Sequence, residues 1–386
     1  MRGVKAFFLI WFLLPCICVA QSDYKGRVLD AKTNAPIPYV NIGIVNKGIG
    51  TVSDEEGLFH LPLNIPDLSP DEKILFSSLG YQSLEIFVRD IELVYNEYPV
   101  IQLEPEIVAL NEVVVTNIDA DFVDELVGNT NSFGTNAYGY WKDNVALGGE
   151  LATRIRVEKG FRKLNSLGFE IASNEMDSVL LRINIYDLAG ERNVSKTNLN
   201  KSGKNILFKL KKDNTNPRID LMPYGISVEN DFVVSLEIIE IYGNDALALA
   251  IPAIHNDAGS FRRYASQDKW ERISDLGMSY YFETSVLLSK KEAEQLNRKK
   301  DKRKKRMRKI YGFVINKGRM LPEVRVLNRR TKESVETDRK GRYTIHAKSS
   351  DILCFEKPNH TTRCFKVKKK NTLNVQMTLN TRRFLP

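Results

Sequence analysis

Residues 38–61, PYVNIGIVNKGIGTVSDEEGLFHL, decide the fold of this chain, because their pattern returns 284 positions later. Seven positions carry the repeat: Pro38, Val40, Ile42, Asp54, Gly57, Phe59 and Leu61 correspond to Pro322, Val324, Val326, Asp338, Gly341, Tyr343 and Ile345. In each copy, alternating apolar residues lead into an acidic turn that ends in glycine, which is typical of two strands joined by a tight turn. We therefore expect two related β-modules that flank a larger block.

The first module is expected over residues 21–104, where short alternating runs are separated by glycine, proline, asparagine and aspartate. A period of two with frequent turns predicts an antiparallel β-sandwich. The turn residues Asp54, Glu55 and Glu56 raise the alternative of a calcium site. A calcium loop spaces its oxygen ligands along the chain, and these three residues are clustered, so we expect no metal here.

Four segments of this region resemble the carboxypeptidase regulatory-like domain of exported proteins from Bacteroidota-type bacteria: GRVLDAKTNAPIPYVNIGI from Gly26, GTVSDEEGLFHL from Gly50, ILFSSLGYQS from Ile74 and LNEVVVT from Leu110. The resemblance implies a seven-stranded, transthyretin-like sandwich that is a non-catalytic appendage. In TonB-dependent receptors a similar LNEVVVT strand leads into a plug and a membrane barrel. Residues from Asn117 onward show no plug pattern and are too few for a large barrel, so we do not expect a transporter.

Residues 105–130 are expected to form a linker with one strand, and residues 131–288 a jelly-roll-like sandwich of about eight strands. The strings LLRINIYDLAGE and YGISVENDFVVSLEII resemble the jelly-roll region that accompanies the regulatory-like module in some exported proteins. Alternation predicts that one face of these strands is buried and the other is in water. The face predicted to be in water carries Arg182, Asn184, Lys209, Ser235 and Glu237.

Two aromatic clusters lie at the ends of this block. Tyr138, Tyr140 and Trp141 form the first, and Trp270 belongs to the second. Exposed rings of this kind stack on sugars, so these four residues are candidates for a glycan-binding platform. The alternative is that the rings close the core of the sandwich, because aromatic side chains dominate core burial.

The segment 289–309 is strongly basic. Between Lys290 and Lys309, twelve lysines and arginines against three acidic residues leave a net charge of +9, equal to that of the whole chain. Its composition favours a helical or flexible connector. A contact with anionic lipid or polysaccharide is the functional alternative, carried by Lys299, Lys300, Arg303, Lys304, Lys305 and Arg306.

Residues 310–379 are expected to form a second, shorter regulatory-like sandwich, followed by a tail over 380–386. Cys354 and Cys364 flank a turn centred near Asn359, so they can face each other across two strands. A disulfide between them suits an exported protein. The alternative is two free cysteines buried as small apolar residues.

Residues 1–20 have the pattern of a secretory signal peptide, since Arg2 and Lys5 precede an apolar run that ends near Ala20. Cleavage after Ala20 is expected. A lipid anchor on Cys16 is the alternative, which Pro15 disfavours. We therefore expect an exported protein at the periplasm or outer membrane, without a transmembrane helix.

No motif of catalysis stands out. The four histidines are scattered without metal-ligand spacing, and neither a nucleophile elbow nor a phosphate-binding glycine loop is present. We expect no enzyme activity, no cofactor and no nucleic-acid partner. The sequence predicts a binding or scaffolding protein of the cell envelope that contacts an envelope protein or a polysaccharide. The alternative is a carbohydrate-binding protein that uses the jelly roll, with a role accessory to nutrient uptake.

Overall fold

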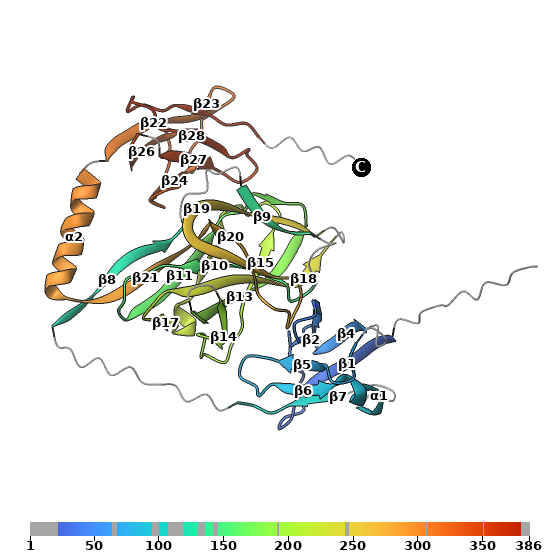
Figure 1. The fold of residues 1–386 in the computed structure, drawn as a ribbon. Coiled ribbons are helices and arrows are strands. Elements are labelled where there is room, and N and C mark those ends of the chain that lie inside the picture. Colours follow the sequence, from blue (N-terminus) through green and yellow to red (C-terminus); the bar gives the residue numbers. More distant parts are fainter. Residues whose placement is uncertain are drawn as a thin grey trace, which may run out of the picture.

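The structure is a computed structural model that describes residues 22–63, 68–94, 100–106, 119–129, 136–141, 146–190, 193–243, 247–305, 307–349 and 351–379. The expected signal peptide, the LNEVVVT segment and the tail lie outside these residues. The chain is all-β, as predicted, with one long helix (Figure 1). Within the described residues, no helix combines the length and the apolar character that a membrane crossing requires.

The first module is a seven-stranded sandwich. Its elements are β1 (Ser22–Asp30), β2 (Asn41–Ile44), β3 (Ile49–Val52), β4 (Leu58–Leu63), β5 (Lys73–Ser77), β6 (Leu84–Phe87), η2 (Val88–Asp90), α1 (Ile91–Val94) and β7 (Val100–Leu103). One sheet has the order β4-β1-β7, with β1 and β7 parallel, and the other has the order β3-β2-β5-β6. Alternate apolar residues of both sheets, among them Val40, Ile42, Phe59 and Leu61 of the repeat, form the core.

The C-terminal module has the same topology. Its strands are β22 (Arg308–Asn316), β23 (Arg319–Met320), β24 (Arg325–Asn328), β25 (Ser334–Glu336), β26 (Arg342–Ala347), β27 (Ile352–Glu356), β28 (Arg363–Lys366) and β29 (Val375–Gln376). Here β22 lies between β26 and a parallel β29, as β1 lies between β4 and β7, and the second sheet has the order β25-β24-β27-β28. The repeat in the sequence is therefore a repeat of the fold.

The acidic turn of the repeat has a structural role in both modules. Asp54 Oδ1 accepts hydrogen bonds from the backbone N–H groups of Glu56 and Leu58, with N···O distances of 3.0 and 2.8 Å. Asp338 Oδ1 accepts the equivalent hydrogen bonds from the backbone N–H groups of Lys340 and Arg342, both at 2.8 Å. These bonds hold the turn before the second strand and lower the pKa of Asp338. The carboxylate of Asp54 is thus used inside its own turn.

Cys354 and Cys364 form a disulfide across β27 and β28, where they stand directly opposite each other. Their Cα atoms are 4.1 Å apart. Asn359 lies between the two strands with a φ of 61°, in the left-handed conformation that asparagine tolerates better than most residues. This local geometry brings the two cysteines together, because the chain reverses midway between them.

Replacing both cysteines with serine is expected to lower the free energy of unfolding of the C-terminal module by about 3 kcal/mol, the loop-closure value for a short cross-linked loop. Thermal unfolding of the purified mature protein, with and without reductant, measures the loss. The wild type should lose stability on reduction and the double serine variant should not respond. An equal response of both proteins would contradict the assignment.

The central module is a two-sheet sandwich. Its strands are β8 (Ala120–Gly128), β9 (Asn136–Trp141), β10 (Glu150–Ile155), β11 (Arg162–Phe169), β12 (Ser173–Asn174), β13 (Ser178–Leu188), β14 (Val194–Asn198), β15 (Ile206–Lys211), β16 (Arg218–Asp220), β17 (Ser227–Val228), β18 (Phe232–Tyr242), β19 (Ala248–Arg263), β20 (Glu271–Met278) and β21 (Tyr280–Ser289), with η3 (Met222–Tyr224) between β16 and β17. A five-stranded sheet has the order β16-β11-β21-β8, with β17 also on β11. A nine-stranded sheet contains the run β19-β10-β18-β13, with β15 also on β13.

This strand order is that of a jelly roll. The chain alternates between the two sheets from β8 to β10, β11 and β13, and again from β15 through β16 and β18 to β21. The first strand, β8, pairs with the last, β21. Such alternation, with the two ends side by side, is what two interleaved Greek keys produce. The strands β9, β12, β19 and β20 widen the larger sheet beyond the basic pattern.

One boundary differs from the sequence prediction. The strand expected inside the linker 105–130 is β8, and it pairs along its whole length with β21, so the jelly roll begins at Ala120 rather than at residue 131. The basic connector, predicted to be helical or flexible, forms the helix α2 (Lys290–Lys305). Ala293 and Leu296 pack on Val123, Val286 and Leu288, so α2 is a docked helix and not a freely solvated one.

Candidate functional site

The outer face of the nine-stranded sheet was predicted to be in water; Lys209 is exposed as predicted, but Arg182, Asn184, Ser235 and Glu237 are buried. Leu181, Ile183 and Ile185 of β13 point into the jelly-roll core, so Arg182 and Asn184 point outward. Arg182 is 4% exposed, and Glu237 on the neighbouring strand β18 is fully buried. The prediction was wrong at these positions because the first module covers this part of the sheet.

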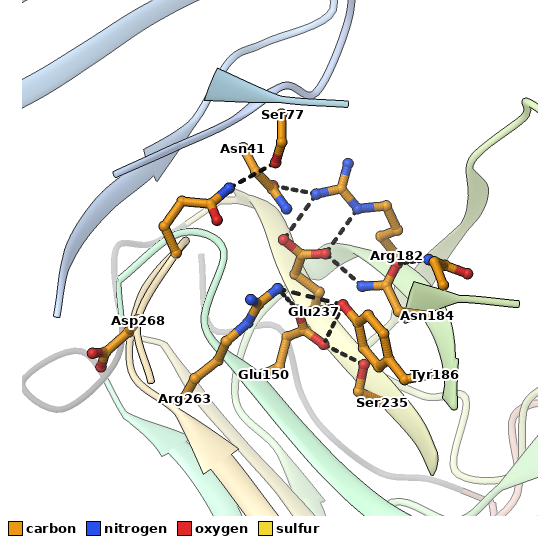
Figure 2. Close-up of polar contacts among 12 residues, drawn as sticks. Asn41, Ser77, Glu150, Arg182, Asn184, Tyr186, Ser235, Glu237, Arg263 and Asp268 are labelled. Atoms are coloured by element: carbon orange, nitrogen blue, oxygen red, sulfur yellow. Dashed lines mark hydrogen bonds and ion pairs between the residues drawn. The ribbon is translucent and has the colours of Figure 1, made fainter. Parts of the chain in front are cut away.

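Arg182 and Glu237 form the centre of the contact (Figure 2). The two residues stand opposite each other in the β13–β18 ladder. The guanidinium donates two bonds to the carboxylate, Nε to Oε2 and Nη2 to Oε1, each 2.8 Å long, and Asn184 Nδ2 donates a third at 2.7 Å. Burial alone would raise the pKa of Glu237, but Arg182 outweighs it and holds that pKa below its usual value. The pair is therefore ionised at neutral pH.

The remaining donors of Arg182 reach into the first module. Nη1 donates to the backbone oxygen of Tyr39 at 2.7 Å, and Nη2 donates to Asn41 Oδ1 (Figure 2). Tyr39 and Val52 also pack on Leu180 and Ile239 of the jelly roll. One buried side chain thus connects an ion pair in the jelly roll to the backbone of the regulatory-like module.

A second buried ion pair lies beside the first on the same face. Arg263 of β19 donates to Glu150 of β10, which also accepts bonds from Ser235 and Tyr186 (Figure 2). Here burial outweighs the attraction of Arg263 and raises the pKa of Glu150. Trp270 covers the pair: its ring lies 5.1 Å from the Arg263 guanidinium and 5.9 Å, edge-on, from the Tyr186 ring.

Close backbone contact completes this first interface. A Cβ atom added at Gly43 or Gly50 would lie within 3.0 Å of the backbone oxygen of Ser266, closer than real Cβ atoms come. Only glycine therefore lets the β2–β3 hairpin approach the loop before β20. Next to this contact, Asn46 N–H donates to Gln267 O at 3.0 Å, and Gln267 Nε2 donates to Ser77 Oγ at 2.7 Å.

The C-terminal module docks on the other sheet of the jelly roll, also through a buried carboxylate. Glu170, which follows β11 and is 1% exposed, accepts a bond from Lys332 Nζ at 2.6 Å, and Arg329 lies 3.5 Å away. The Lys332 ammonium also lies 4.3 Å from the centre of the Tyr281 ring. Burial lowers the pKa of Lys332. Asn216 Nδ2 adds a bond of 3.0 Å to Glu356.

The charged groups of both interfaces are partnered with one another. Each buried carboxylate of the two interfaces faces a cation of the protein. The Ser235 and Tyr186 hydroxyls both donate to the buried Glu150 carboxylate. Among the described residues, no three histidine, cysteine or acidic side chains are grouped as a metal site requires. What the arrangement does chemically is to fix two flanking modules on one jelly roll.

The predicted aromatic platform does not form on the described residues. Tyr140 is fully buried, and its hydroxyl donates to Leu236 O at 2.5 Å, so it belongs to the core. Burial raises the pKa of that hydroxyl well above its usual value. Tyr138 packs on the same core and bonds Ser274, while Trp270 covers Arg263 in the separate cluster described above. The side chain of Trp141 lies outside the described residues.

The predicted basic residues lie on α2 and just after it. Lys299 is exposed, and Lys300 donates to the backbone oxygen of Asp124. The side chains of Arg303, Lys304, Lys305 and Arg306 lie outside the described residues. The two interfaces were missed at the sequence level. Their only signal was an Arg, Asn and Glu set on strands whose other face is strongly apolar.

Fold and interfaces together define a class: a multi-module β-sandwich protein whose charged networks join modules. Residues 24–115 match the model of the CarboxypepD_reg-like domain, so the first module is a domain of this type, which is regulatory-like and non-catalytic. The match agrees with the resemblance seen in the sequence. No curated protein matches the chain.

Solved structures give only distant likenesses. The cysteine protease and lectin-like domains of Cwp84 from Clostridium difficile are 10% identical, with a TM-score of 0.29; the match covers 69% of this chain and 63% of that one, so this chain spans less than two thirds of it. BcpA, the major pilin subunit of Bacillus cereus, is 8% identical over 93% of this chain and 99% of that chain, with a TM-score of 0.16. Scores this low transfer no function.

Proposed function

We propose that the chain is an exported protein of the cell envelope that works as a rigid, non-catalytic binding or scaffolding unit. The observation that carries the proposal is the pair of buried charged interfaces that fix both flanking modules on the jelly roll. Interfaces between modules of one chain are by default of modest size and allow the modules to move relative to each other. Here an arginine with no exposed donor spans one junction, which suits a protein that holds surfaces at set positions.

The open sheet edges are the surfaces that such a unit offers. In the first module β6 and β7 end their sheets, and in the C-terminal module β25 and β28 do. An extended segment of a partner adds to an edge of this kind through backbone hydrogen bonds, without a reactive centre. The partner class that fits is therefore an envelope protein that presents a strand. The glycan alternative has no support from the aromatic residues, since Tyr140 and Trp270 are engaged within the fold.

The test is a cross-linked pull-down of the tagged mature protein from envelope fractions of its own organism, scored for proteins and glycans. We expect one or two envelope proteins in near-equal amount. A matched experiment with the Gly43→Val variant, in which the first module should be loosened, should recover less of a partner that contacts two modules. Recovery of polysaccharide without a protein partner would contradict the proposal.

Mass spectrometry of the same preparation tests export. The mature chain should begin at Gln21, as cleavage after Ala20 requires. A chain that keeps residues 1–20, or that begins at a lipid-modified Cys16, would contradict this part of the proposal.

A further inference from the structure

Two basic segments that are far apart in the sequence meet at the start of the C-terminal module. Arg308, at the end of the basic run that contains α2, donates to the backbone oxygens of Lys368, at 2.7 Å, and Lys369. It also donates to Asn371 Oδ1 at 2.9 Å. One guanidinium therefore fixes the loop 366–371 beside the residues that follow α2.

The loop adds charge of one sign. Residues 357–379 contain six lysines and arginines and no acidic residue. The side chains of Lys366, Lys368, Lys369 and Lys370 are exposed. Within the described part of the chain, none of these four ammonium groups is paired with a carboxylate. Together with Lys309 they form what we call the basic patch: Lys309, Lys366, Lys368, Lys369 and Lys370.

Helix α2 extends this charge away from the module. Ser289 and Glu292 form a capping box at its start: Ser289 N–H donates to Glu292 Oε2 at 3.0 Å, and the Ser289 hydroxyl at 2.6 Å. The cap and the Ala293–Leu296 contact fix the helix on β8 and β21. Lys299 and Lys302 are left exposed along it, toward the end that leads to Arg308. Cations at this end also suit the helix dipole.

An exposed aromatic ring lies within the patch. Tyr311 of β22 is 51% exposed, and its backbone N–H donates to Asn371 O at 2.9 Å, which places it next to the lysine loop. Tyrosine is enriched where a protein meets lipid headgroups, because its ring is apolar and its hydroxyl is polar. Binding of a polyanion in solution depends on the lysine charges alone, whereas binding to a lipid surface also involves the Tyr311 ring.

We propose that the basic patch with Tyr311 binds the phosphate-bearing headgroups of an anionic lipid surface and orients the scaffold on a membrane. This inference rests on the proposed location in the cell envelope, but its test needs only the purified protein. Charge complementarity carries it, since each basic residue near such a surface strengthens binding about fivefold. If the pull-down finds no protein partner, the lipid-binding proposal still stands. If the basic patch does not bind lipid, the proposal of a protein partner still stands.

The test is co-sedimentation of the mature protein with phosphatidylethanolamine vesicles, with and without phosphatidylglycerol. Binding should need phosphatidylglycerol and should weaken from about 0.1 M to about 1 M salt, as the screening length falls from ~10 to ~3 Å. The triple variant Lys368→Gln, Lys369→Gln, Lys370→Gln should bind about a hundredfold more weakly, at about fivefold per charge. Tyr311→Ser should also weaken binding, while both variants keep the wild-type unfolding curve.

The matched control is Lys196→Gln, Lys201→Gln, Lys204→Gln, which removes the same charge from exposed positions of the jelly roll. It should bind like the wild type. An equal loss of vesicle binding in both triple variants would mean that net charge alone explains the binding, and it would overturn the proposal. So would binding to soluble polyphosphate without binding to vesicles, or vesicle binding that ignores phosphatidylglycerol.

Discussion

Replacing Arg182 with methionine is expected to lower the free energy of unfolding of the jelly roll by about 3–5 kcal/mol. The substitution keeps an apolar stem of similar length but leaves the fully buried Glu237 carboxylate without its cation, and the cost of an uncompensated buried charge is of this size. The backbone oxygen of Tyr39 loses its donor as well. Urea unfolding followed by tryptophan fluorescence measures the change.

The matched control is Arg272→Met. Arg272 pairs with Asp275 at the surface, where the carboxylate is 63% exposed, so the loss should not exceed about 1 kcal/mol. A double variant, Arg182→Met with Glu237→Leu, should recover much of the stability, since a buried ion pair replaced by apolar residues costs little. A single Arg182→Met variant as stable as the control would show that the interface does not form.

Replacing Gly43 with valine is expected to detach the first module from the jelly roll, with a local shift of the β2–β3 hairpin and both modules otherwise folded. The new Cβ meets the backbone oxygen of Ser266, its shortest contact, and that of Ile49 in its own hairpin at 2.9 Å. No rotamer change can move either oxygen, so the hairpin must shift locally and retreat from the loop. Overpacking of this kind costs about 1–3 kcal/mol. The donor bonds of Arg182 to Tyr39 and Asn41 should be lost with it.

Hydrogen exchange measures this release. The Asn46 N–H in the β2–β3 hairpin, which bonds Gln267 O, should exchange faster in the variant, and so should amides of the loop 265–268 that the hairpin covers. Lys25→Val, which adds the same side chain at an exposed position of β1 in the same module, should leave these amides protected. Unchanged protection in Gly43→Val would mean that the two surfaces do not touch.

The sequence predicted what depends on local patterns. The repeated turn was found because Asp54 and Asp338 bond amides two and four residues away. That the two cysteines can face each other followed from their short turn, although the sequence left the bond itself open. Periodicity also gave the correct facing of β13, with Leu181 inward and Arg182 outward. All three rest on residues close together in the chain.

What the sequence could not predict is which outward faces are covered. Arg182 and its acceptor Tyr39 are 143 positions apart, and Glu170 and Lys332 are 162 apart. Nothing in a strand's own pattern tells a charged face in water from one that another module covers. Tyr140 shows the same limit: the sequence left its ring either in the core or on a sugar-binding surface, and it is a core residue whose hydroxyl is satisfied by Leu236 O, 96 positions away.

The central claim is that the flanking modules are fixed on the jelly roll, and the distance between spin labels tests it most directly. Labels on Lys25→Cys in the first module and Thr344→Cys in the C-terminal module lie at exposed positions of β1 and β26. We expect one narrow distance distribution in the otherwise wild-type protein and a broad one after Gly43→Val. A broad distribution in the wild type would contradict it, because the modules would then move independently.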